Sequence, residues 1–500
     1  MSQGTRSIVD ELRDAGRTLV ADSPRAASGP TSAPVDATPG TGERNAQAGP
    51  RSPRGARPEA LTPLVPRSPT TLQEAGLSLG FVSDMVLKLL YAHGSLVGQD
   101  IAHQIRLPFA IIDEGLRFLK DQRCVEVSGG EVVGRVSYRF ALTELGRLRA
   151  RETFDQCRYV GPAPVTMDQY VAQCRRQTVM GIPCTPESLQ SAFEGFILRP
   201  GLLEDLGPAV CSGRSIFVYG PPGNGKTVVA KGLGRYLNSF GGDIFVPYAI
   251  QAENSIITVY DPVLHQATDD GELVRRGVIA KSSVTSAPSG AIGGDISLDL
   301  RWRRIRRPVI ITGGELTLDM LELQLHKTGN FYNAPLHIKA NGGVFLIDDF
   351  GRQLVSPKDL LNRWIVPLEE KIDYLSLSSG RKFALPFEQL IVFSTNLDPK
   401  DLVDDAFLRR IRYKIRIDPP TRAIYAQIFA TQCRQRGVPQ SEAVVDYVFS
   451  EYYDKGRVPR SSDPRDLLDL AQALCRFHDQ PLTWEPAVMQ YAAGRLFHEV

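Results

Sequence analysis

Gly220-Pro221-Pro222-Gly223-Asn224-Gly225-Lys226-Thr227 is the stretch that decides the fold of this 500-residue chain. It follows the apolar run 215–219, typical of a buried parallel strand, and precedes the segment 228–237, which has apolar residues at helical spacing. Glycines let backbone N–H groups turn inward at a helix N-terminus and hold phosphate oxygens. Lys226 can reach the β- and γ-phosphates, and the Thr227 hydroxyl can bind Mg²⁺. The stretch therefore predicts an α/β protein that binds a nucleoside triphosphate through all eight residues; the alternative is an ordinary glycine-rich turn.

A second apolar strand, 343–347, runs into two carboxylates, Asp348 and Asp349. At the end of a core strand, Asp348 can hold Mg²⁺ beside the phosphate loop. The adjacent Asp349 can orient or deprotonate an attacking water. Two acids at a strand end are a weak signal alone, but they become a strong one when they follow a phosphate loop in this chain order.

Over roughly residues 200–490 the ordered motifs resemble those of the AAA+ ATPases, a branch of the P-loop NTPases. The motifs are Gly220–Thr227, Ile347-Asp348-Asp349, Ser394-Thr395-Asn396, Phe407-Leu408-Arg409-Arg410 and Pro464-Arg465. The resemblance implies a parallel-sheet core with a C-terminal helical lid, ATP and Mg²⁺ as cofactors, and a homo-oligomer, most often a hexameric ring.

The resemblance also implies roles for single residues. Asn396 would position the attacking water. Arg409 or Arg410 would act as an arginine finger on the ATP of the adjacent subunit, with Arg412 as a further alternative, and Arg465 would report the nucleotide state from the lid. The sequence departs from the family at Asp349, where the usual residue is Glu, which implies either slow hydrolysis or a different position of the attacking water. The alternatives to these catalytic roles are that the arginines are ordinary surface charges and that Asn396 forms a turn after the strand.

Composition and motifs divide the chain into five parts. We expect a disordered arm at 1–70, with a short helix at 6–20 that is either a docking peptide or a frayed tail, and then a winged-helix-like α+β domain at 71–155. A helical linker at 156–200 follows. The ATPase core at 201–418 carries an insertion at 250–308, and a helical lid occupies 419–500. Within the core, 244–249 is the expected second strand and 316–327 an expected helix.

The winged-helix-like part is not basic. Three helical segments precede a β-hairpin, but the stretch 71–155 holds ten Lys/Arg and eleven Asp/Glu, a net charge of 10 − 11 = −1. The third helix opens its polar face with Asp113 and Glu114, where a helix that reads a DNA groove needs basic or amide side chains. We therefore favour a protein-contact or regulatory role over DNA binding for this part.

Two further segments each have two interpretations. The basic run Arg301–Arg307 surrounds Trp302 and either grips nucleic acid or an acidic neighbouring subunit, or forms a solvated face. The turn 329–335 carries Phe331 and Tyr332, which either grip a polypeptide in the pore of a ring or pack beneath the loop.

The bulk composition is that of a soluble globular protein, with 42% hydrophobic residues and a net charge of +2. No apolar run is long enough to span a membrane, and the N-terminus has no secretory signal. Seven scattered cysteines without zinc spacing indicate reduced thiols, as in the cytoplasm. We therefore expect a cytoplasmic ATPase that remodels a protein client. The alternatives are a DNA-associated loader, helicase or transcription regulator, and a nucleotide switch that scarcely hydrolyses ATP.

Overall fold

The computed structural model describes residues 65–130, 134–269, 297–402 and 408–497. The expected helix at 6–20 and most of the expected arm therefore lie outside the described residues. None of the helices in the described ranges is both long and apolar enough to cross a membrane.

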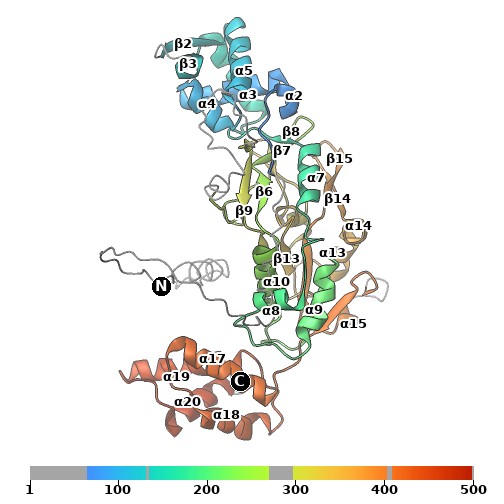
Figure 1. Ribbon diagram of the computed structural model, residues 1–500, viewed down its shortest axis with the longest axis vertical. Coiled ribbons are helices and arrows are strands. Elements are labelled where there is room, and N and C mark those ends of the chain that lie inside the picture. The colour runs from blue at the N-terminus through green and yellow to red at the C-terminus, as the bar shows by residue number, and fades with distance from the viewer. Residues whose placement is uncertain (1–64, 131–133, 270–296, 403–407, 498–500) are drawn as a thin grey trace, which may run out of the picture. The chain divides into compact units, whose positions relative to one another are not determined.

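A five-stranded parallel sheet forms the centre of the fold (Figure 1). In spatial order its strands are β10 (Val309–Thr312), β13 (Val344–Ile347), β16 (Leu390–Thr395), β5 (Ile216–Tyr219) and β17 (Tyr413–Arg416). Every neighbouring pair is parallel. The predicted α/β class with a parallel sheet is confirmed.

Helices cover both faces of this sheet because its strands are apolar on both sides. Ile216 and Val218 of β5 pack into one core with residues of α8 (Pro186–Ala192), α9 (Leu202–Cys211) and α10 (Lys226–Phe240). Phe217 packs into the opposite core with residues of α13 (Pro357–Arg363) and α14 (Ile365–Glu370). Alternate side chains of a strand point to opposite faces, so continuous apolar strands require two helical layers.

The segment predicted as the second strand of the core forms a strand but does not join the parallel sheet. The strand β6 (Ile244–Pro247) forms where expected, but it pairs antiparallel with β9 (Trp302–Ile305) in a separate two-stranded sheet. The strand that joins the parallel sheet next in the chain is β10. An apolar run identifies a buried strand, whereas its partner depends on contacts distant in the sequence.

A second five-stranded sheet has the order β11 (Gln324–His326), β12 (Phe331–Asn333), β8 (Ser255–Thr258), β7 (Ala249–Ala252) and β4 (Val165–Thr166). It combines β4 of the expected linker, β7 and β8 at the start of the expected insertion, and β11 and β12, which follow that insertion. A hairpin of β14 (Ile372–Ser376) and β15 (Lys382–Pro386) follows later in the chain. The helix expected over 316–327 is wrong: the short 3-10 turn η2 (Leu318–Leu321) and β11 occupy this stretch. Leucines at 321, 323 and 325 alternate as in a strand.

The N-terminal part contains the expected helices and hairpin. Its helices are α2 (Leu72–Ala75), α3 (Leu79–His93), α4 (Gly98–Ile105), α5 (Phe109–Asp121) and α6 (Glu144–Gln156). The strands β1 (Ser95–Val97), β2 (Val125–Gly130) and β3 (Tyr138–Leu142) form an antiparallel sheet in the order β1-β3-β2. Apolar side chains of α3, α4 and α5 form its core.

The sequence suggested that Asp113 lies on an open polar face of the third helix, but the structure does not place it there. Its side chain is buried and contacts Arg117 at 2.6 Å and Arg135 at 3.1 Å. The carboxylate therefore engages two of the cations of this part, while Glu114 remains exposed.

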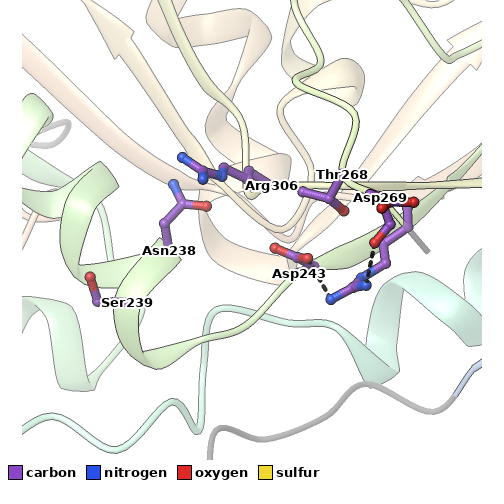
Figure 2. Close-up of a pocket in the computed structure, with 7 residues that line it drawn as sticks. Asn238, Ser239, Asp243, Thr268, Asp269 and Arg306 are labelled. Atoms are coloured by element: carbon purple, nitrogen blue, oxygen red, sulfur yellow. Dashed lines mark hydrogen bonds and ion pairs between the residues drawn. The ribbon is translucent and has the colours of Figure 1, made fainter. Parts of the chain in front are cut away.

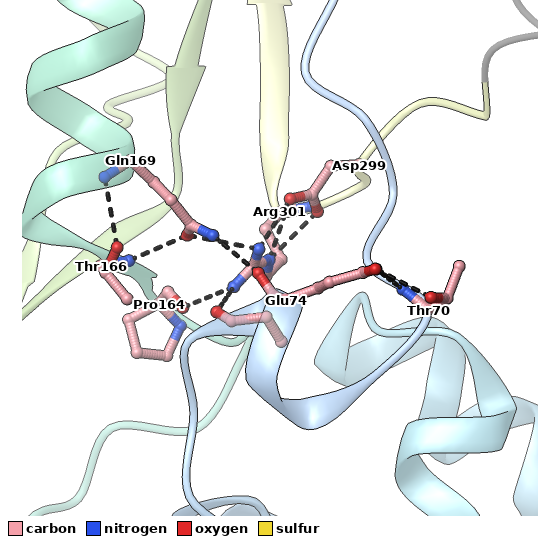
Figure 3. A network of polar contacts seen from close by, with 8 residues as sticks. Thr70, Glu74, Pro164, Thr166, Gln169, Asp299 and Arg301 are labelled. Carbon is pink, nitrogen blue, oxygen red and sulfur yellow. Dashed lines mark hydrogen bonds and ion pairs between the residues drawn. The ribbon is translucent and has the colours of Figure 1, made fainter.

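Arg301 joins the N-terminal part to the segments that follow it (Figure 3). Its guanidinium is 1% exposed and pairs with Asp299 at 2.8 Å. It also donates to Ala75 O at 2.9 Å and Pro164 O at 3.2 Å. Gln169 of α7 (Met167–Arg176) completes the network by donating to Glu74 O. A guanidinium has five N–H donors in a fixed fork, which suits this bridging position.

Arg307 is buried at the other end of the same basic run. It donates to the carbonyl oxygens of Gln177, Gly241, Gly242 and Gly342, at distances of 2.6–3.2 Å. Gln177 and Gly241 are the C-caps of α7 and α10, where a helix dipole favours a cation. Since Trp302 is also buried, the run 301–307 as a whole forms neither an exposed grip nor a solvated face. Of its arginines, Arg306 is exposed, and Arg303 and Arg304 are half-buried.

The C-terminal part is a cluster of helices: α17 (Arg422–Arg436), α18 (Glu442–Val448), α19 (Asp463–Phe477) and α20 (Pro486–Phe497) (Figure 1). The π-helical turn η3 (Phe449–Tyr453) continues α18. Tyr425, Phe429 and Leu468 lie in their shared apolar core. The expected C-terminal helices are therefore present.

Candidate functional site

The phosphate-loop stretch connects β5 to α10 and includes the first two residues of that helix, at the carboxyl edge of the parallel sheet. Gly220 has φ +140°, and a Cβ there would lie 2.2 Å from Ile417 O. Gly223 has φ +78°, and a Cβ there would lie 2.8 Å from Ser462 Oγ. Glycine is therefore needed at both positions for conformational and steric reasons.

Lys226 begins α10 and points its ammonium group into this loop. Nζ donates to Gly220 O at 3.0 Å, to Pro221 O at 2.9 Å and to Asn396 Oδ1 at 2.6 Å. Burial lowers the pKa of Lys226, while the nearby carboxylates of Asp348 and Asp349 act in the opposite direction. The ammonium group thus links the loop directly to the end of β16.

Asp348 follows β13, and its carboxylate contacts the first turn of α10 and the end of β16. Its Oδ2 accepts from Thr227 Oγ1 at 2.8 Å, and its Oδ1 accepts from Ser394 Oγ at 2.7 Å. Sequence reasoning quoted Ser394 only as part of a motif and gave it no role. The serine fixes the orientation of the carboxylate, leaving oxygen donors of Asp348 and Thr227 side by side.

Asp349 and Asn396 form the next contact. Asn396 Nδ2 donates to Asp349 Oδ1 at 2.8 Å, while its Oδ1 accepts from Lys226. Asp349 has φ +50°, a conformation that Asp tolerates better than most residues. Both ends of the Asn396 amide are therefore occupied, which orients it between the second acid and the lysine.

The C-terminal helices contact the phosphate loop through residues that sequence reasoning missed. Ser462 N donates to Gly223 O at 2.9 Å, and Ser461 N donates to Asn224 Oδ1 at 3.0 Å. Asn224 is buried, so its side chain serves as a contact to the C-terminal helices as well as part of the loop. The Ser461-Ser462 pair precedes α19 without a distinctive spacing, and the only available signal was its position just before Asp463-Pro464.

Arg465 lies in the first turn of α19, and its exposed guanidinium pairs with the adjacent Asp466 at 3.0 Å. Within the described residues, no hydrogen bond or ion pair joins it to Lys226, Thr227 or the two acids. The structure therefore brings together five of the predicted side chains at the loop and leaves Arg465 outside that set.

Arg409 and Arg410 lie at the opposite edge of the sheet. They line a cavity of about 380 Å³ together with Arg214, Leu368, Glu369 and Arg412. Arg214 precedes β5 and Arg412 precedes β17, so the cavity lies at the amino ends of these parallel strands. Arg410 pairs with Glu369 at 2.7 Å, whereas Arg409 is exposed.

A second cavity, of about 460 Å³, lies beyond the C-terminal half of α10 (Figure 2). Arg304 spans it, pairing with Asp243 at 2.8 Å and donating to Asp269 O at 3.1 Å. Asn238 bonds to the backbone of Arg307. The charged side chains of this cavity therefore contact one another or the backbone of the same chain.

Tyr332 and Phe331 take the packing interpretation of the 329–335 turn. Tyr332 is 5% exposed, and its hydroxyl contacts Ser378 Oγ and accepts from Ser378 N at 3.0 Å. Phe331 stacks on His326 with ring centroids 5.0 Å apart. The pore-gripping interpretation is wrong for Tyr332, because its side chain is enclosed by its own chain.

Comparison with known proteins gives limited matches. A family model described as a domain of unknown function (DUF8689) matches residues 421–495. The vesicular-fusion protein sec18 of Schizosaccharomyces pombe is 32% identical over 87 residues, which are 16% of this chain and 11% of that protein. The chain thus matches only about a tenth of the length of this curated relative.

Three solved structures are similar in part. NtrX from Brucella abortus has a TM-score of 0.33 at 11% identity, covering 69% of this chain and 61% of that chain. Domain III of the replication initiation protein DnaA from Thermotoga maritima has 0.30 at 16%, covering 63% and 97%. A RuvB mutant from Thermotoga maritima has 0.29 at 11%, covering 62% and 70%.

Proposed function

We propose that this chain is a Mg²⁺-dependent ATP hydrolase of the AAA+ type, which couples turnover in a ring-shaped homo-oligomer to the remodelling of a protein client. One observation carries the proposal. Side chains that follow three neighbouring strands, β13, β16 and β5, meet at one edge of the parallel sheet and contact one another. Ligand sites of parallel α/β sheets lie at this carboxyl edge.

The oxygen donors present suit Mg²⁺. Thr227 Oγ1 and Asp348 Oδ2 lie together, and no cluster of three metal-ligating side chains occurs in the described ranges. Mg²⁺ in nucleotide sites is held by one or two protein groups together with phosphate oxygens and water. When bound, the ion would neutralise charge on the phosphates.

The remaining groups then have distinct tasks. Lys226 exchanges some of its contacts with Gly220 O and Pro221 O for phosphate oxygens, because an ammonium group interacts more strongly with an anion than with a carbonyl. Asp349 accepts a proton from the attacking water or orients it, and Asn396 holds that carboxylate in position. The shorter reach of Asp349 relative to Glu is consistent with slow turnover.

The arginine cavity supports action between subunits. A four-residue strand such as β5 separates its two edges by roughly 13 Å at about 3.3 Å per residue. Arg409 therefore cannot reach the phosphate loop of its own chain, and a second copy must supply it. We assign Arg409 as the finger because it is exposed, whereas the ion pair with Glu369 restrains Arg410.

The charges of the N-terminal part favour a protein client over DNA. Asp113 pairs with Arg117 and Arg135, so its carboxylate offsets part of the positive charge near α5. Arg301 and Arg307 are buried and cannot contact phosphates. The DNA-associated alternative is left with exposed cations such as Arg306, and phosphate contacts supply most DNA affinity.

A subunit-mixing experiment tests both the site and the trans arrangement. Lys226→Ala removes the phosphate contact but retains Arg409, and Arg409→Ala does the reverse. Each variant alone should hydrolyse ATP poorly, since loss of an arginine finger reduces turnover by about 10³-fold or more. After mixing and subunit exchange, ATP turnover should partly recover, because mixed rings contain intact sites between unlike neighbours.

The matched controls are each variant mixed with itself, and Arg416→Ala, which changes an exposed arginine outside the cavity. Normal turnover by Lys226→Ala would refute the site. Normal turnover by Arg409→Ala would refute the finger, and loss in both variants without any recovery on mixing would refute the sharing of sites between copies.

A further inference from the structure

Cys184 and Cys211 stand apart from the other cysteines of the chain. All seven are in described ranges and are free thiols. Cys211 is exposed and Cys184 is half-buried, whereas Cys124, Cys174, Cys433 and Cys475 are buried and Cys157 is half-buried elsewhere. Peroxide reaches exposed thiols first, so Cys211 is the natural entry point for oxidation.

Each of the two thiols contacts the backbone of the segment that carries the other. Cys211 Sγ donates to Cys184 O at 3.6 Å, and Cys184 Sγ donates to Gly207 O at 3.9 Å. Gly207 lies one helical turn before Cys211 on the same helix, α9. Burial and a hydrogen bond with the Cys211 thiol raise the pKa of Cys184 to about 11. The sulfur atoms are therefore neighbours, held between α9 and the segment before α8.

Both cysteines adjoin groups on which the proposed ATP site depends. Tyr236 of α10, the helix that begins with Lys226, donates its hydroxyl to Ile182 O at 3.3 Å and Pro183 O at 3.0 Å, just before Cys184. On the other side, Cys211 is three residues before Arg214, which lines the arginine cavity. A covalent link between the cysteines would constrain both connections.

We propose that Cys184 and Cys211 are a reversible redox site, which forms an intramolecular disulfide when hydrogen peroxide oxidises the protein and thereby restrains α10 and the arginine cavity. The Cys211 thiol gives its proton to solvent and the thiolate attacks one peroxide oxygen. The O–O bond breaks, and the departing hydroxide takes a proton from solvent, so a sulfenic acid and water result. The Cys184 sulfur then attacks the sulfenic sulfur, the S–O bond breaks, and a second water leaves with the Cys184 proton. Two thiols lose two electrons in total, and one peroxide is reduced to two waters.

Peptide mapping of the full-length protein tests the cross-link. Protein treated with hydrogen peroxide is alkylated, digested without reductant and analysed by mass spectrometry. A linked Cys184–Cys211 peptide should appear, and dithiothreitol should remove it. It should be absent from Cys184→Ser and Cys211→Ser, and unchanged in the matched control Cys157→Ser.

Two outcomes would overturn the site. The first is oxidation of Cys211 to sulfinic acid without a linked peptide, and the second is a Cys211–Cys211 link between two copies. The melting temperature provides a readout besides activity: it should rise on oxidation of the wild type, because a cross-link constrains the unfolded chain, and stay constant in Cys211→Ser.

The control exerted by the disulfide rests on the proposed function and is measured separately. ATP turnover should be lost on oxidation of the wild type, return on reduction, and persist in oxidised Cys211→Ser. A linked peptide with unchanged turnover would overturn the restraint alone. Absent turnover in the reduced wild type would instead count against the proposed ATPase, while the peptide map would still decide the disulfide.

Discussion

Replacing Arg307 by Met should destabilise the pairing of β6 with β9. The arginine donates hydrogen bonds to buried carbonyl oxygens, and a methionine side chain has no donor for them. Its guanidinium is 5% exposed and serves four carbonyl groups, two of them at the C-caps of α7 and α10. Burial lowers the pKa of Arg307 to about 10, which keeps it charged near neutral pH. Leaving a buried acceptor unsatisfied costs about 1–3 kcal/mol.

If only two of the four carbonyls lose their only partner, the loss is about 3 kcal/mol in the free energy of local opening. Native-state hydrogen exchange measures this energy at the amides paired across Ile244 and Ile305. Since about 1.4 kcal/mol corresponds to a factor of ten, these amides should exchange more than a hundredfold faster. Arg307→Lys should fall between, because one ammonium group cannot serve the same fork of acceptors.

The neighbouring Arg306 is the matched control. It belongs to the same basic run but is exposed, so Arg306→Ala should change the opening energy by less than about 0.5 kcal/mol. Equal exchange in the two variants would refute the buried-acceptor reasoning. Duplex-DNA affinity, measured in parallel, should not differ between the Arg307 variants once they are folded. A loss of affinity in Arg307→Met with unchanged exchange would restore the nucleic-acid interpretation of the run.

Two other changes test burial elsewhere. Tyr332→Phe removes a hydroxyl bonded to Ser378 and should lower the free energy of unfolding, measured in urea, by about 1–2 kcal/mol. The control Tyr374→Phe changes a half-exposed ring and should leave this free energy unchanged. An unchanged free energy in Tyr332→Phe would instead support a pore-lining Tyr332. Burial lowers the pKa of Lys371 to about 8, against 10.5 in the unfolded chain, which therefore binds more protons between these values. Wild-type stability relative to Lys371→Met should rise with pH in that window, by up to about 1.4 kcal/mol per pH unit, and parallel pH profiles would contradict this assignment.

The local sequence was sufficient for the parts of the site that follow core strands. The apolar strand, the glycine-rich loop and the helix are consecutive in the sequence. Their order therefore predicted that Lys226 and Thr227 lie where the loop meets the helix. The same reasoning predicted Asp348, because parallel strands end at a common edge of their sheet. Asn396 was predicted from the resemblance to the AAA+ ATPases. The five side chains do meet there. Their catalytic roles remain a prediction.

Long-range contacts decided what spacing could not express. Periodicity marks a buried strand but not its partner, so β6 was assigned to the wrong sheet. Residue type suggests exposure, yet Arg307 and Tyr332 are buried because distant segments offer acceptors and packing. Ser461 and Ser462 contact the phosphate loop although more than two hundred residues of sequence separate them from it. Such contacts depend on where separate segments meet in space, and no local pattern of residues carries that information.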